Sequence, residues 1–345
     1  MKKKTIITIS IISVLVLSLA VYVVLNWDRG SFSPELLKEQ PPLIVAGDKL
    51  YKYDFSTENI TQLANVKFKN ISYNKDKTKI AGIASEVEGK TEAANFLVEY
   101  NTQTNEATKL FSTDELEKMS GVAEKSLHYS FENAKYYKDG FSLLCKNYVE
   151  YDDRLVLLQQ NKDTQQWEIH TVFSFSKDIE EEDKFIFDYL IDDENNTAYI
   201  LTTNGLIKYN LETKEIKQFE DIYESEMTIS NDGKSIFFIG SGITKYDIAT
   251  ESFEEIYSHD YSLLSVTMYQ SGVFSPDGRF IARIKESDTM QTHVKDLEFM
   301  LDSDSLDAGS MLDSMDISIC VFDLEKGKET TIDFMELPYS SSIAW

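Results

Sequence analysis

Short apolar strands alternate with polar turns along the chain from residue 43 onward. In five places a strand of alternating apolar and polar residues stops at Asp or Asn, crosses a short polar turn and resumes as a second strand. The five are KLYKYDF at 49–55, FLVEYNT at 96–102, GLIKYNL at 205–211, GITKYDI at 242–248 and SICVFDL at 318–324. A phrase that recurs in this way predicts one repeated β-hairpin.

A second phrase precedes the first in most units, with a turn that contains Asp followed by another apolar strand. It reads ISYNKDKTKIAGIA at 71–84, IDDENNTAYILT at 191–202, ISNDGKSIFFIG at 229–240 and FSPDGRFIARI at 274–284. Asp-Gly and Asn-Asn supply the positive φ angles that tight hairpin turns require. We therefore expect the turn carboxylates to cap their own backbone, and not to act in catalysis or metal binding. They are Asp76, Asp193, Asp232 and Asp277.

Joined together, the two phrases define six units of similar length. The units span residues 43–64, 68–111, 127–173, 185–219, 226–257 and 272–332. Repeated four-stranded units predict an all-β fold, a six-bladed β-propeller over residues 43–345. Aromatic residues at one register of the repeat are expected to pack between blades. These are Tyr53, Tyr100, Tyr209, Tyr246 and Phe322.

The first unit begins at LIVAG, which corresponds to the second strand of the other units, so its innermost strand is missing. The last six residues, SSSIAW at 340–345, match the strand that enters the Asp turn elsewhere. We therefore predict that the C-terminal strand completes blade one, with Ile343 beside residues 43–46 and Trp345 largely buried.

Two inserts interrupt the repeat. STDELEKM at 112–119 places Ser112 three residues before Glu115, a capping-box spacing that predicts a short helix. The longer insert, 285–316, is acidic and has apolar residues at helical spacing, Val294, Leu297, Met300 and Leu301. It is interpreted either as a surface excursion or as a flap that binds a partner or Ca²⁺. Its DSDSLDAG segment departs from a calcium loop because Leu306 takes a ligand position.

The N-terminus predicts a membrane anchor. Residues 5–25 carry no charge and are long enough to cross a bilayer as a helix. Lys2, Lys3 and Lys4 precede this segment, which predicts a cytoplasmic tip at 1–4 and an extracytoplasmic ectodomain. Residues 26–42 are then a stalk that ends in two prolines. The alternative is a cleaved signal peptide with Ser18 and Ala20 near the cut.

The chain is strongly acidic, with 59 acidic against 34 basic residues and a net charge of −25. Such a charge disfavours nucleic acid as a partner and favours cations, basic peptides or basic proteins. The alternative is that acidity only keeps the ectodomain soluble. The two cysteines, Cys145 and Cys320, lie in apolar strands of different units and are expected to be buried free thiols.

The segments FSPDGRFIARI and ISNDGKSIFFIG, each followed by a KYDI- or FDL-type hairpin, resemble the TolB-type six-bladed propellers with WD40-like repeats. FSPDGRF at 274–280 is the closest match, whereas SYNKDKTK and DDENNTA lack the Pro and Gly of the motif. The resemblance implies a bacterial envelope protein that binds protein partners. Its motif describes a fold, and the departures in half of the blades leave the partner undetermined.

The sequence contains none of the catalytic motifs found in enzymes built on propellers or in related hydrolases. There is no GxSxG elbow, no CxxCH motif and no sialidase box, and the chain has only four arginines, Arg29, Arg154, Arg279 and Arg283. The histidines stand without a second metal ligand at helical or hairpin spacing. They are His128, His170, His259 and His293. A sugar-stacking face would need aromatics outside the repeat register, namely Tyr136, Tyr137, Tyr257, Tyr261 and Tyr269.

From these patterns we predict no catalytic, cofactor-binding or metal-binding residues and no cofactor. The favoured function is a membrane-tethered propeller that binds a protein or peptide, with residues 5–25 in the cytoplasmic membrane. One alternative is an envelope polysaccharide hydrolase or lyase that uses carboxylates at the channel mouth. Another is a purely structural scaffold.

Overall fold

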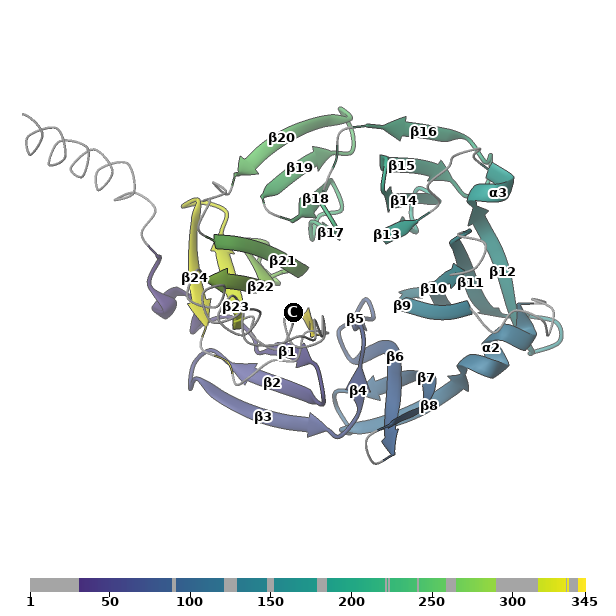
Figure 1. Cartoon of the computed structure of the whole chain (residues 1–345), viewed down its shortest axis with the longest axis horizontal. Coiled ribbons are helices and arrows are strands. Elements are labelled where there is room, and N and C mark those ends of the chain that lie inside the picture. Colours follow the sequence, from purple (N-terminus) through teal and green to yellow (C-terminus); the bar gives the residue numbers. More distant parts are fainter. Residues whose placement is uncertain are drawn as a thin grey trace, which may run out of the picture.

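A computed structural model describes residues 31–88, 91–120, 129–147, 152–178, 185–220, 222, 224–240, 242–258, 265–289, 316–332, 334 and 341–345. Within these residues, six antiparallel sheets surround a central axis, as Figure 1 shows. The prediction of an all-β six-bladed propeller is confirmed, and each predicted unit corresponds to one sheet.

The first three blades run from the N-terminal half of the chain, with the innermost strand given first here. Blade one contains β25 (Ser342–Ala344), β1 (Leu43–Ala46), β2 (Leu50–Asp54) and β3 (Asn59–Ala64). In blade two, β4 (Lys67–Phe68) and β5 (Ser72–Tyr73) both pair with β6 (Lys79–Glu88), followed by β7 (Thr91–Asn101) and β8 (Glu106–Ser112). Blade three contains β9 (Tyr129–Tyr137), β10 (Gly140–Asn147), β11 (Arg154–Gln160) and β12 (Trp167–Ser174).

The other three blades follow the same plan. Blade four contains β13 (Ile186–Asp192), β14 (Thr197–Thr202), β15 (Gly205–Asn210) and β16 (Ile216–Phe219). Blade five contains β17 (Glu226–Ile229), β18 (Ser235–Ile239), β19 (Ile243–Asp247) and β20 (Ser252–Tyr257). Blade six contains β21 (Ser265–Phe274), β22 (Phe280–Thr289), β23 (Asp316–Asp323) and β24 (Lys328–Ile332).

One hairpin turn recurs in all six blades, after the third strand. In blade one the Asp54 carboxylate accepts hydrogen bonds from the backbone N–H groups of Ser56 and Thr57, at 2.9 and 3.2 Å. Side chains of the same type hold the turn in the other blades. They are Asn101, Asn161, Asn210, Asp247 and Asp323. Four residues after each of the six, the backbone has positive φ. The residues with positive φ are Glu58, Asn105, Gln165, Lys214, Glu251 and Gly327.

The inner turns also use carboxylates as caps. Asp76, Asp232 and Asp277 each accept a hydrogen bond from the backbone N–H two residues later, at 3.1 to 3.3 Å. The expectation for Asp193 is wrong, because Asp192 makes the corresponding bonds to Glu194 and Asn195. Asp193 is instead partly desolvated, and this burial raises the pKa of its carboxyl.

The predicted packing residues lie between blades. Tyr53, Tyr100, Tyr209, Tyr246 and Phe322 are all buried. Cys145 and Cys320 are also buried, both are free thiols, and burial raises the pKa of Cys145 to about 12 and that of Cys320 to about 11.

Blade one receives its innermost strand from the C-terminus, next to β1 in Figure 1. The antiparallel register pairs Ile343 with Val45 and Ala344 with Ile44. Trp345 is only 5% exposed, and its indole Nε1 donates a hydrogen bond of 2.9 Å to the carbonyl of Pro41.

The segments outside the blades differ in part from expectation. The predicted short helix is α2 (Thr113–Met119), and the Ser112–Glu115 capping box is present at its start. A second helix, α3 (Phe175–Asp178), follows β12. The acidic insert is shorter than predicted, because β22 continues to Thr289 and β23 begins at Asp316. Its proposed helix and calcium loop lie outside the described residues.

Residues 31–42, expected as part of a stalk, pack on the propeller. The 3₁₀ turn η1 (Pro34–Leu37) buries Leu37, and Phe32 stacks on Phe280 with ring centres 5.6 Å apart. These two apolar side chains account for the difference, since they join the core between blades six and one. Residues 5–25 lie outside the described residues, and no helix within the described residues has the length and hydropathy of a membrane span.

Candidate functional site

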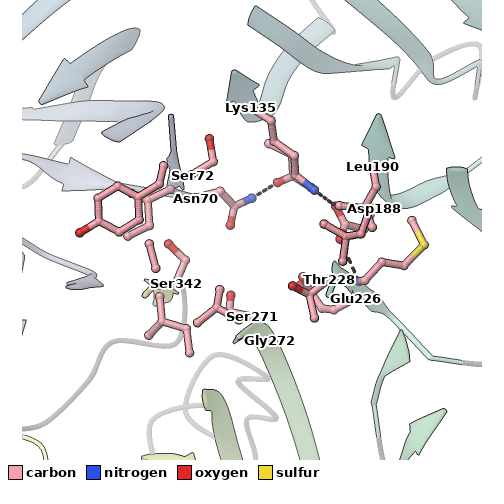
Figure 2. Close-up of a pocket in the computed structure, with 18 of the residues that line it drawn as sticks. Asn70, Ser72, Lys135, Asp188, Leu190, Glu226, Thr228, Ser271, Gly272 and Ser342 are labelled. Atoms are coloured by element: carbon pink, nitrogen blue, oxygen red, sulfur yellow. Dashed lines mark hydrogen bonds and ion pairs between the residues drawn. The ribbon is translucent and has the colours of Figure 1, made fainter. Parts of the chain in front are cut away.

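The innermost strands of the six blades enclose a cavity of about 390 Å³ on the propeller axis. Each blade contributes a polar side chain to its lining. From blade one to blade six these are Ser342, Ser72, Lys135, Asp188, Glu226 and Ser271. Figure 2 shows this ring of side chains around the open centre. The convergence of polar groups from every blade makes the cavity the candidate site.

An ion pair forms one wall of the cavity. The Lys135 Nζ lies 2.7 Å from the Asp188 Oδ1 and also donates a hydrogen bond to the backbone carbonyl of Tyr189. Asp188 accepts two further hydrogen bonds, from the backbone N–H of Tyr189 at 2.8 Å and from that of Met227 at 2.9 Å. Asp188 therefore links blades three, four and five around the axis, and its carboxylate is almost fully occupied.

Glu226 lies beside this pair with much less support. The backbone N–H of Ser271 donates to its carboxyl group, and within the described residues Glu226 forms no ion pair. Burial raises the pKa of Glu226 to about 8, and the neighbouring Asp188 carboxylate contributes to the increase. At neutral pH Glu226 is therefore mostly the uncharged acid.

The opposite wall is formed by uncharged groups. The Asn70 side-chain amide donates to the Asn133 Oδ1, and the Ser72 hydroxyl donates to the Ala134 carbonyl at 3.0 Å. Ser342 is 3% exposed, and its hydroxyl has no hydrogen-bond partner within the described part of the chain. A buried hydroxyl without a partner carries a free-energy cost.

Three of the inner strands are irregular where they line the channel. The pairing register shifts near Asn133 in β9, near Phe187 in β13 and near Ser271 in β21. Asn133 and Ser271 have positive φ, at 47° and 52°. Residue 272, next in the chain, is glycine, and a Cβ there would lie 1.7 Å from the Ile239 Cδ1. Bulges of this kind redirect backbone groups, and here one directs the Ser271 N–H to Glu226.

The histidines singled out in the sequence do not gather at the cavity in the part of the chain that the structure describes. His170 lies on the outer strand β12 with 57% of its side chain exposed, near Glu168 at 3.5 Å. His128, His259 and His293 lie outside the described residues. Across the described ranges, no three His, Cys, Asp or Glu side chains are placed to hold a metal ion.

The other sequence candidates are also dispersed. Arg154, Arg279 and Arg283 form separate ion pairs with Asp152, Asp323 and Glu329. They therefore do not converge on one carboxylate, and Arg29 lies outside the described residues.

Of the off-register tyrosines singled out in the sequence, Tyr136 is the one within the described residues that lines the cavity. Its hydroxyl donates to the Glu99 carboxylate at 3.1 Å. Tyr137 is buried and Tyr257 packs on Phe322. The position of Tyr261 and the side chain of Tyr269 are not described. The off-register tyrosines that the structure describes therefore do not gather at the cavity.

Comparison with known proteins identifies the fold and no family. The sequence matches no family model and no curated protein. Among solved structures, a chain of a nidogen/laminin complex superposes with a TM-score of 0.53 at 9% identity, over 88% of this chain and 98% of that chain. The periplasmic gluconolactonase PpgL of Pseudomonas aeruginosa superposes with a TM-score of 0.51 at 10% identity, over 87% of this chain and 97% of that one. At such low identity these similarities show a shared propeller fold.

Proposed function

We propose that this protein is a membrane-tethered, extracytoplasmic binding propeller whose ligand places a polar group in the central channel. The observation that carries the proposal is the cavity, where all six blades supply a polar side chain. A polar enclosure of about 390 Å³ is large enough for a small molecule or for one side chain of a peptide. The tether rests on the uncharged segment 5–25 and the three lysines before it. The resemblance of FSPDGRF to TolB-type repeats supports an envelope role.

Binding has more support than catalysis. Glycoside cleavage ordinarily uses two carboxyl groups that flank the bond. Asp188 is held by Lys135 and by two backbone N–H groups, so it is a structural member of the channel wall. Glu226 is then the one carboxyl of the described lining that remains available to a ligand. A single available carboxyl suits recognition better than this two-carboxylate chemistry.

The test is whether filling the channel removes a ligand. The full-length chain, purified in detergent, would be incubated with the dialysable fraction of an envelope extract, washed, and analysed by mass spectrometry for retained molecules. Thr228→Trp places a large ring in the cavity, whereas Gln62→Trp adds the same ring on the exposed face of β3. We expect one retained molecule with the wild type and Gln62→Trp, and its loss with Thr228→Trp. Equal retention by all three proteins, or none by any, would contradict the proposal.

A further inference from the structure

We propose that the ligand of the channel cavity carries one organic cation, an ammonium or guanidinium group, which pairs with Glu226. This inference rests on the proposed binding function and specifies the chemistry of the ligand. The cation is either the head of a small amine or the side chain of a basic peptide.

The charged groups around Glu226 favour a cation as the ligand. Among the strands packed near it, β13 presents Asp188 and β9 presents Lys135, and these two charges cancel. Strands β18 and β21 contain no charged residue, and β21 presents only the Ser271 N–H. Lys77 also lines the cavity, where it donates to the backbone oxygen of Trp345 at 2.8 Å, and it is not among the charges that shift the pKa of Glu226. An ionised Glu226 therefore has no ion-pair partner at its own position within the described residues, and a ligand cation would supply one.

The protonation of Glu226 also favours a cation as the ligand. Burial raises the pKa of the Glu226 carboxyl because a buried charge without a partner is unfavourable. At neutral pH the side chain therefore keeps its proton. An entering ammonium group would take over the role of that proton. The exchange balances as a carboxylic acid plus a ligand cation giving a carboxylate–cation pair and one released proton.

The lining also supplies hydrogen-bond acceptors. Asn70 lines the same cavity as Glu226, and its side-chain carbonyl can accept a hydrogen bond. An ammonium group has three N–H donors and a guanidinium group has five, so either satisfies several acceptors at once. An anion would instead meet two carboxyl groups, and both lysines of the described lining are already engaged. Lys135 is bound by Asp188 and the Tyr189 carbonyl, and Lys77 by the Trp345 backbone oxygen.

The experiment is titration calorimetry on the full-length chain in detergent. The probes are butylguanidinium and acetyl-Gly-Arg-Gly-amide, each with a neutral isostere, butylurea and the corresponding citrulline peptide. We expect binding of at least one cationic probe and at least a 10-fold weaker affinity for its isostere. Comparison of butylguanidinium with the peptide shows whether the cation belongs to a small amine or to the side chain of a basic peptide. Glucose and gluconate serve as a neutral polyol and an anion.

Proton release provides a readout that a merely structural role would not change. At pH 7, titrations in two buffers of different ionisation enthalpy should report close to one proton released per bound cation. Affinity should rise about 10-fold between pH 6 and pH 7, where the carboxyl is mostly protonated, and level off above pH 8. Glu226→Gln should lose proton release and at least 10-fold in affinity, while Glu254→Gln, an exposed glutamate on β20, should match the wild type. A thermal melt would verify that both variants are folded.

Failure of this inference is distinguishable from failure of the binding function. Equal affinity for a cation and its isostere, binding of glucose or gluconate in place of the cations, or binding without proton release would overturn the cation assignment. If neither cation binds but an extract molecule is retained and then lost with Thr228→Trp, the channel is a binding site for another class of ligand.

Discussion

Replacing Trp345 by Ala tests whether the C-terminal strand holds the propeller together. Trp345 packs its ring 5.2 Å from the Phe55 ring and 6.5 Å from the Phe280 ring, which come from blades one and six. Its indole N–H is bonded to the carbonyl of Pro41 at 2.9 Å. The substitution would therefore open a cavity at the junction of the first and last blades and leave the Pro41 carbonyl without this donor.

The expected cost follows from that burial. Trp345 is 5% exposed, and removal of a buried Trp side chain costs about 3–5 kcal/mol. At about 2.1 cal/mol/K of unfolding entropy per residue, a propeller of roughly 300 residues has an unfolding entropy near ~0.6 kcal/mol/K. The melting temperature should then fall by about 5–8 °C. Deleting residues 341–345 should do more, because it also exposes the edge of β1 to pairing with other chains.

Calorimetry or circular dichroism of the full-length chain in detergent would measure both variants. Phe187→Ala is the matched control, because this ring is 43% exposed and its loss should shift the melt by less than about 2 °C. Trp345→Ala that melts with the wild type would refute the assignment of Trp345 to the core. A soluble, unchanged deletion variant would show that β25 contributes little to closure.

Three further predictions concern the channel, the insert and the anchor. Because folding raises the pKa of Glu226 to about 8 from 4.5, the folded chain keeps a proton that the unfolded chain loses between these values, so stability should fall as pH rises from about 5 to 8. Glu226→Gln should flatten that part of a denaturation-versus-pH curve, and an unchanged slope would contradict the pKa. Replacing residues 290–315 by a short Gly-containing turn should retain a cooperative melt, since β22 and β23 already pair as far as Ser287 and Asp316; loss of cooperativity would place the insert in the core. The chain should sediment with membranes after a carbonate wash and be digested beyond residue 26 by protease added to wall-stripped cells, whereas a soluble form starting near Val21 would indicate a cleaved leader.

The blades could be predicted from the sequence because their turns are local. An Asp or Asn side chain that accepts hydrogen bonds from the backbone N–H groups two and three residues later requires no long-range contact. The same residue types therefore recur at this position in each repeat. Blade three shows how far this signal extends. Its hairpin lacks the aromatic of the other blades, with Gln160 in that place, yet Asn161 forms the same turn and Gln165 has the same positive φ.

The sequence indicates the residues of the candidate site less clearly than it indicates the blades. Ser72, Lys135 and Asp188 each precede an Asp of the inner turn by four residues, and Glu226 and Ser271 precede theirs by six. In a strand these even spacings place side chains on one face, so polar residues there indicate the channel. The spacing alone could not show which residues pair, because pairing depends on how neighbouring blades are placed around the axis.

The contrast between the two channel carboxyl groups depends on that placement. Burial with few hydrogen bonds favours the neutral form of a carboxyl group, which is the case of Glu226. Asp188 receives Lys135 from the preceding blade and the Met227 N–H from the following one, whereas Glu226 receives a single N–H from Ser271, exposed by a bulge in β21. If β21 were regular, the Ser271 N–H would no longer be directed to Glu226. If blade three were shifted, Lys135 would no longer reach Asp188. The chemistry of the channel is therefore a property of the closed ring, which is why the integrity of the β25–β1 junction and the state of Glu226 should be measured in the same variants.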